Sequence, residues 1–327
     1  MDTDHLLLPS TAEFFTRGQA LAHGETDRSL RAALRAGAVV RLRHGAYART
    51  SLVETLDDRS RHLLLARAAL QQQRGEVALA GPSAALLHGF DVFGHDLDVV
   101  HLTRLDTGAG RREAGVVHHV VGRAAALRVQ LQEGVLVVSP EDAVWQTALL
   151  STLEGAVVTA DSALHRHPGL AEPLRALVLR TRAQPRSRTA RLALRIARAE
   201  TESAGESLTR IACFRHGIPC PTPQHDVLDA SGRLIGRADF YWEEARLLGE
   251  FDGRIKYERL LRKGQSSSDA VVREKRREDA MRSTSRGMTR FTWSEVQPDV
   301  AYRRMAELAR ELEVSRRLYV RVPAPRS

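Results

Sequence analysis

The chain opens with short apolar stretches, first at helical and then at strand spacing. Thr16 begins a capping-box pattern, which is typical of a helix N-terminus. Thr26 can cap a second helix over residues 27–36. Apolar and polar residues then alternate over residues 39–48, as in two short strands around a turn. Residues 1–52 are therefore predicted to form a small winged helix-turn-helix.

Helical and strand-like patterns alternate through residues 53–195, for example a strand over 135–138. We predict a mixed α/β middle domain here, with a strongly basic helical connection over residues 182–198. His118 and His119 are adjacent on a predicted strand, so their side chains are expected to point to opposite faces. This argues against a shared metal site.

The last part of the chain, residues 196–327, has the pattern of a third, α/β domain. A helix is predicted over residues 203–217, followed by strands over 234–242 and 246–252. A tight turn separates these two strands, which favours an antiparallel hairpin. The predicted fold class is thus a multidomain α/β protein.

Carboxylates are expected to gather on this hairpin. If it is centred between residues 244 and 245, Asp239 lies directly across from Glu250. Because side chains alternate along a strand, Glu250 and Asp252 share a face. Crowded carboxylates of this kind suit Mg²⁺ or Mn²⁺. The alternative is a set of structural carboxylates paired with Arg237 or Arg254.

The balance of charge favours a polyanionic partner. The formal net charge is +9, from 49 basic and 40 acidic residues. Lysine occurs only at positions 256, 263 and 275, close in sequence to the acidic hairpin. Lys256 and Lys275 are therefore candidates for a catalytic base or cation.

Arginines are frequent in the predicted winged helix. Those that we expect to contact DNA lie on its second helix and on its hairpin, where Arg43 begins the turn, namely Arg28, Arg31, Arg35, Arg41 and Arg43. The alternative is a helix-plus-hairpin capping unit with solvated arginines.

Two further clusters were weighed as sites. Cys213, His216, Cys220 and His225 have spacings that permit zinc, but the helix that contains the first two needs apolar side chains for its core. Tyr241, Tyr257 and Trp293 could stack on bases, whereas alternation places Trp242 in the core.

The last 125 or so residues contain matches to a known nuclease group. They are Glu206 on the leading helix, residues 236–240 and 248–253, and a helix over 272–282 before residues 291–293. At these positions the chain resembles the PD-(D/E)xK nuclease superfamily, particularly the branch related to very-short-patch-repair endonucleases. The resemblance implies a restriction-endonuclease-like core with Asp239 and Glu250 as metal ligands. It makes Glu206 an outer ligand, although Ser203 to Glu206 also fits a capping box.

One position departs from the pattern of that superfamily. Two residues after Glu250 the family has lysine, and this chain has Asp252. The basic group at the site must then come from elsewhere, and Lys256 and Lys275 are the candidates.

The first two predicted domains resemble a second group. Residues 15–21, 40–47 and 81–89 are similar to antitoxin-like regulators of the AbiEi group. In that group the N-terminal winged helix is linked to promoter binding. Neither a toxin partner nor an oligomeric state can be read from the sequence.

We therefore expect a DNA-binding protein whose last domain is a metal-dependent endonuclease acting on phosphodiester bonds. The alternative is a non-enzymatic transcriptional regulator or antitoxin with a degenerate nuclease fold, and an RNA-acting nuclease would use the same residues. With two cysteines, no signal-peptide pattern and no apolar run of membrane-spanning length, the protein is expected in the cytoplasm, away from membranes.

Overall fold

The computed structural model describes residues 13–73, 75–106, 109–120, 127–181, 184, 187–252, 277, 280–281, 284 and 286–320. They belong to two compact units, residues 1–159 with 169–194 and residues 160–168 with 195–327. Helix α7 (Leu153–Arg166) supplies residues to both units. The division into three domains stays a prediction. Lys256, Lys275 and Tyr257 lie outside the described residues.

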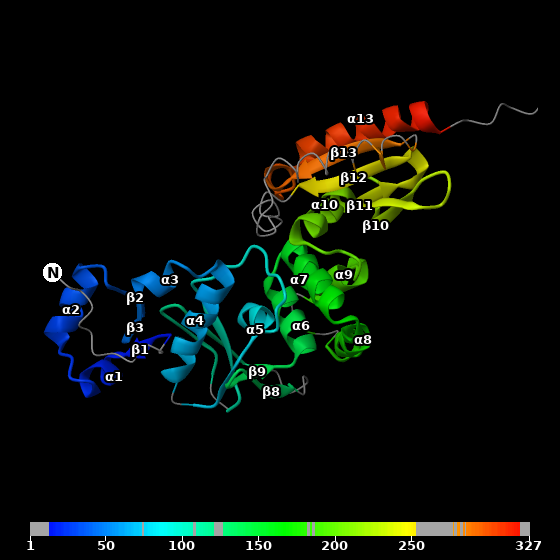
Figure 1. The fold of residues 1–327 in the computed structure, drawn as a ribbon. Helices are drawn as coiled ribbons and strands as arrows, with labels where there is room; N and C mark the ends of the chain where they lie inside the picture. The colour runs from blue at the N-terminus through cyan, green and yellow to red at the C-terminus, as the bar shows by residue number, and fades with distance from the viewer. Residues whose placement is uncertain are drawn as a thin grey trace, which may run out of the picture. The chain divides into compact units, whose positions relative to one another are not determined.

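The first unit begins with two short helices and a three-stranded sheet, drawn in blue in Figure 1. The elements are β1 (Phe15–Thr16), α1 (Arg17–Ala22), α2 (Asp27–Arg35), β2 (Val39–Arg43), β3 (Ala46–Arg49) and α3 (Thr50–Val53). Capping boxes start both α1 and α2, at Thr16 and Thr26. The core contains Phe15, Leu30 and Tyr47. This arrangement is compatible with the predicted winged helix.

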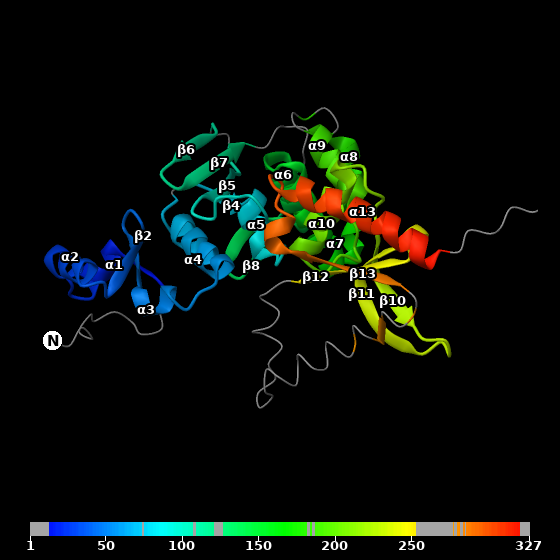
Figure 2. The same cartoon turned by 90° about the horizontal axis from the view of Figure 1, so that it is seen from above.

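The rest of the first unit is a six-stranded mixed sheet with helices. Its strands are β4 (Val77–Leu79), β5 (Val100–Arg104), β6 (Arg111–Glu113), β7 (Val116–Val120), β8 (Val129–Gln132) and β9 (Val135–Val138), in the order β6-β7-β5-β4-β9-β8. Figure 2 shows β6 and β7 beside β5. The helices, besides α7, are α4 (Asp58–Gln71), α5 (Gly81–Leu87), α6 (Pro140–Leu150), α8 (Ala171–Arg180) and α9 (Ser187–Ile196), whose last residues enter the second unit. The predicted mixed α/β character is confirmed.

The second unit has a four-stranded sheet with the order β10-β11-β12-β13. Its elements after α7 are α10 (Ala204–Arg215), β10 (Thr222–Leu228), β11 (Leu234–Trp242), β12 (Leu247–Asp252), β13 (Gly287–Thr292) and α13 (Ala301–Tyr319). Strands β10 to β12 are antiparallel, and β13 runs parallel to β12. Figure 1 shows α13 along this sheet, next to β13.

A buried ion pair joins α7 to α10 inside the second unit. Arg210 Nη1 donates to Asp161 Oδ2 at 2.7 Å, and the two side chains are 8% and 1% exposed. Ser207 Oγ and the backbone N–H of Arg198 also donate to the Asp161 carboxylate. The guanidinium donates further to Thr201 Oγ1 and to the carbonyl of residue 196. The network therefore holds the start of α10 in place.

None of the described helices is both long enough and apolar enough to cross a membrane.

Candidate nucleic-acid interface and carboxylate site

Helix α2 presents three arginines on its outer side. Arg28, Arg31 and Arg35 are all exposed, while Leu30 of the same helix is buried against the core. A bidentate pair from Arg17 to Asp27, with both distances 2.7 Å, joins the start of α1 to the start of α2. The hydrogen bond from Arg17 lowers the pKa of the Asp27 carboxyl. Helix α2 is therefore joined to α1 at its start, and its three arginine side chains are exposed.

Strand β2 of the hairpin places its two arginines differently from each other. Arg41 is exposed, as predicted for a DNA-contacting residue. The ladder with β3 shifts register between Arg41 and Arg43, which marks a β-bulge. The bulge turns Arg43 into a cavity, where its Nε and Nη1 have no hydrogen-bond partner among the described residues. Arg43 therefore does not lie on the exposed wing surface that the sequence predicted.

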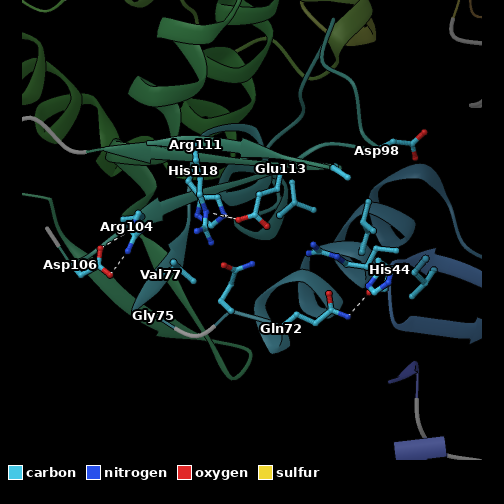
Figure 3. A pocket seen from close by; sticks show the side chains of 17 residues that line it. His44, Gln72, Gly75, Val77, Asp98, Arg104, Asp106, Arg111, Glu113 and His118 are labelled. Atoms are coloured by element: carbon cyan, nitrogen blue, oxygen red, sulfur yellow. Dashed lines mark hydrogen bonds and ion pairs between the residues drawn. The ribbon is translucent and has the colours of Figure 1, made fainter. Parts of the chain in front are cut away.

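That cavity has a volume of about 880 Å³ and lies between the hairpin, α4 and the six-stranded sheet. Figure 3 shows Arg111, Glu113 and His118 grouped at one end, with His44 and Gln72 on the other side. Gln72 Nε2 donates to the carbonyl of His44 at 2.9 Å, which ties α4 to the turn of the hairpin. The sequence analysis did not find this cavity, because its lining comes from segments far apart in the chain.

His118 and His119 point to opposite faces of β7, as their adjacency predicted. His118 is buried and lines the cavity. His119 Nε2 lies 2.9 Å from His101 Nδ1, and the two rings are stacked. Burial, then the neighbouring rings of His119 and His95, lower the pKa of His101 to about 3.

The His101–His119 pair predicts acid sensitivity. A histidine in the unfolded chain has a pKa near 6.5. Below that pH the unfolded chain therefore binds a proton at position 101, whereas folded His101 stays neutral. The stabilising effect of neutral His101 is complete above about pH 6.5 and is lost as the pH falls toward its folded pKa of about 3. We expect stability to fall by up to about 1.4 kcal/mol per pH unit from this residue. Urea unfolding from pH 7 to 5 measures it.

A variant that cannot titrate is the control for this effect. His101→Asn should flatten the dependence of unfolding free energy on pH relative to that of the wild type. Equal slopes for the wild type and His101→Asn would contradict the assignment.

The predicted hairpin register in the second unit is confirmed. Strands β11 and β12 pair Phe240 with Gly249 and Trp242 with Leu247, and one further step places Asp239 opposite Glu250. Asp239 Oδ2 accepts a hydrogen bond from the backbone N–H of Phe251 at 2.8 Å.

Glu250 and Asp252 have different surroundings. Glu250 is buried, and Arg277 Nη2 donates to its Oε1 at 2.7 Å. Asp252 is half-buried at the end of β12, where it pairs with Thr292. Among the residues that the structure describes, no three acidic, histidine or cysteine side chains are grouped to hold a metal ion. The joint binding of one metal ion by Asp239, Glu250 and Asp252 therefore stays a prediction, and Arg277 lies beside Glu250.

Glu206 is buried at the N-terminal turn of α10. Its carboxylate accepts hydrogen bonds from Ser203 Oγ, the backbone N–H of Glu202 and Gln224 Nε2. Burial, together with the nearby Asp239 carboxylate, raises the pKa of Glu206. Ser203 also accepts a hydrogen bond from the backbone N–H of Glu206 as the helix cap.

The remaining candidate residues mostly have packing contacts. Cys213 is buried in α10 with its Sγ 3.8 Å from Met305 Sδ, and Cys220 is exposed. His225 stacks on Tyr241, with ring centroids 4.0 Å apart. Trp242 is buried, as alternation predicted, while Trp293 is 46% exposed.

Comparison with known proteins found a family match for the first part of the chain. Residues 6–50 match a family model described as transcriptional regulator, AbiEi antitoxin. Two uncharacterized proteins of Mycobacterium tuberculosis, MT2308 of strain CDC 1551 and Rv2248 of strain H37Rv, are each 29% identical over 230 residues, which cover 69% of this chain and 78% of theirs. A crystal structure of the RV2827C protein from Mycobacterium tuberculosis aligns with a TM-score of 0.38 and 17% identity over 57% of this chain and 72% of that one. The stretch that folds as α1, α2 and the β2–β3 hairpin is therefore the part of the chain that matches a family of transcriptional regulators.

Proposed function

We propose that this protein is a DNA-binding transcriptional regulator of the AbiEi antitoxin type. The observation that supports it best is the match of residues 6–50 to that family, over a segment whose second helix exposes Arg28, Arg31 and Arg35. The sequence analysis gave this function as the alternative, and it now replaces the endonuclease as our main hypothesis.

Duplex DNA is the partner that fits this segment. The second helix of a helix-turn-helix enters the major groove, and exposed arginines neutralise phosphates along its edges. Arg41 extends the basic surface to the hairpin. Such a regulator acts where the DNA lies, so the cytoplasm is its proposed compartment.

The test is binding of a fluorescent duplex by anisotropy over a range of salt concentrations. Affinity should fall linearly on a log–log plot against salt, because each neutralised phosphate releases counterions. Single-stranded DNA of the same sequence should bind more weakly. A protein with no affinity for duplex at low salt would contradict the proposal.

A metal-dependent phosphodiesterase in the second unit is a second candidate. It is supported by the β11–β12 register, which one step beyond Phe240 and Gly249 sets Asp239 opposite Glu250, in a sheet with the order β10-β11-β12-β13. Asp239 and Glu250 would supply one or two carboxylates to Mg²⁺ or Mn²⁺. Oxygen atoms of the substrate and water would then complete the coordination shell. The ion, when bound, would activate water and neutralise phosphate charge.

The residues of this chain also limit that candidate. Arg277 donates to Glu250, and protein donors hydrogen-bond both oxygens of Glu206, so a metal ion would have to compete with these partners for either carboxylate. Asp252 stands at the lysine position of the nuclease pattern, and Lys256 and Lys275 remain proposals because they lie outside the described residues.

Cleavage assays separate the two candidates. The phosphodiesterase predicts that plasmid DNA, single-stranded DNA or RNA is cut with Mg²⁺ or Mn²⁺, and that Glu250→Gln abolishes cleavage while duplex affinity is kept. The regulator predicts tight duplex binding without cleavage under any metal. Equal cleavage by the wild type and Glu250→Gln would exclude the assigned site.

A further inference from the structure

The cavity beside the hairpin contains a guanidinium that the described residues leave without a hydrogen-bond partner. Arg43 is half-buried, and neither its Nε nor its Nη1 has such a partner there. Burial lowers the pKa of Arg43, with the Glu113 carboxylate acting in the opposite sense. An arginine stays protonated in proteins, so this charge and its donors carry a desolvation cost in the folded chain.

The local backbone geometry of β2 directs the Arg43 side chain into the cavity. Residues two apart on a regular strand share a face, so Arg41 and Arg43 would point the same way. The register shift between them leaves Arg41 opposite Tyr47 and Arg43 opposite Ala46. Bulges of this kind are found where a side chain is aimed at a site.

His118 is a second side chain in this cavity whose buried nitrogen atoms lack a hydrogen-bond partner among the described residues. It is 4% exposed, and neither ring nitrogen has a hydrogen-bond partner among the described residues. Its Nε2 lies 3.7 Å from Glu113 Oε1, beyond hydrogen-bonding distance. Burial lowers the pKa of His118, so near neutral pH the ring offers one donor and one acceptor.

The other charges of the lining are largely compensated. Arg104 donates to both oxygens of Asp106 at 2.6 Å, and Arg111 Nε lies 2.5 Å from Glu113 Oε1. In Figure 3, Asp98 lies away from this group, at the far side of the cavity. Among the arginines of the lining that the structure describes, Arg43 is therefore the one without an ion-pair partner, and its charge can attract a ligand. Apolar surface comes from Leu42, Leu65, Val77 and Val100.

We propose that this cavity binds a small organic anion, with a phosphate or carboxylate group on Arg43, a polar group at His118 and an apolar body against the leucine and valine side chains. Guanidinium is the side chain best suited to hydrogen-bond either anionic group. A volume of about 880 Å³ lies within the range of sites for small molecules.

The site also gives the ligand a route to DNA binding, a consequence that rests on the proposed function. Leu42, Arg43 and His44 belong to the hairpin and line the cavity, while Arg41 on the same strand faces outward. An anion in the cavity lowers the positive potential at the hairpin. Bound ligand should therefore weaken duplex binding by about fivefold or more, and duplex should weaken ligand binding by the same factor.

Calorimetry on the full chain without DNA tests the site. The probes are phenyl phosphate, AMP and benzoate, with neutral benzyl alcohol as the control. At least one anionic probe should bind with a Kd of about 1 mM or tighter, and benzyl alcohol more weakly. Phenyl phosphate against benzoate separates phosphate from carboxylate. No binding by any anionic probe would overturn the proposal.

Matched variants locate the binding. Arg43→Gln should weaken binding of the anionic probe by about tenfold or more, and His118→Gln should weaken its binding as well. Arg41→Gln removes the same charge two residues earlier, outside the cavity, and should leave probe affinity unchanged. Equal losses in Arg41→Gln and Arg43→Gln would overturn the site.

Thermal unfolding distinguishes a binding residue from a structural one. Because Arg43 carries unsatisfied donors, Arg43→Gln should keep or raise Tm while it loses the probe. A lower Tm with unchanged probe affinity would show a structural role and overturn the proposal. Probe binding without duplex binding would instead refute only the proposed regulator, since the calorimetry contains no DNA.

Discussion

Replacing Asp161 with asparagine is expected to lower the free energy of unfolding by about 3–5 kcal/mol. Asp161 is 1% exposed, and its carboxylate receives donors from Arg210, Ser207 and the backbone of Arg198. Asparagine keeps the size but removes the charge, so the Arg210 guanidinium stays buried without a counter-charge. Urea unfolding monitored by tryptophan fluorescence measures the loss.

An exposed ion pair provides the control for Asp161. Glu172 and Arg175 pair within α8 with side chains 78% and 74% exposed, so Glu172→Gln should change stability by less than about 1 kcal/mol. The double replacement Asp161→Leu with Arg210→Met should cost less than Asp161→Asn alone, because no uncompensated charge remains. A loss of under about 1 kcal/mol in Asp161→Asn would mean that water or another group compensates Arg210.

Alanine at Arg28, Arg31 and Arg35 together should weaken duplex binding by about two to three orders of magnitude at roughly 0.1 M salt. Each lost phosphate contact removes about 0.9 from the slope of log affinity against log salt, so three contacts remove about 2.7. Their exposed positions on α2 make unfolding of the variant unexpected. Anisotropy titrations at several salt concentrations provide both numbers, and circular dichroism checks the fold.

The chain contains a matched control on another helix. Arg188, Arg191 and Arg195 on α9 repeat the spacing of three and four residues found at Arg28, Arg31 and Arg35. Alanine at these three positions removes the same net charge, yet the salt slope should stay that of the wild type. If both triple variants lose the same affinity, attraction by the total charge of the chain explains binding, and α2 has no special role.

Much of the fold follows from local pattern. Strand β9 was predicted over residues 135–138 and strand β11 over 234–242, and both have these bounds. Pairing across the tight turn also fixed the register that sets Asp239 opposite Glu250. In these segments alternation and turn chemistry agree, and a one-residue slip would move every side chain to the wrong face.

Elements without a one-sided pattern escaped the sequence analysis. Helix α7 is buried on several sides, with Ala156, Val157, Thr159 and Asp161 all buried, so it has no single apolar stripe. Strand β6 reads Arg-Arg-Glu at the edge of its sheet, where charge replaces alternation.

The candidate sites show the same limit. Alternation correctly separated His118 from His119. The sequence analysis placed Arg43 in the turn of a DNA-contacting hairpin, because a bulge of one residue leaves no mark in an alternating sequence. Arg277, 27 residues later in the chain, donates to Glu250, whereas Lys256 and Lys275 lie outside the described residues. Such long-range pairs depend on how the elements pack and not on local spacing.

The division of helix α7 between the two units limits how recombination can exchange one unit between proteins. The unit that contains the four-stranded sheet includes residues 160–168 as well as residues 195–327, so it is discontinuous in the gene. A recombination event that transferred only the later segment would deliver Arg210 without Asp161. Exchange of this unit between proteins is therefore expected to carry the second half of α7 with it, or to be accompanied by loss of the buried charge at position 210.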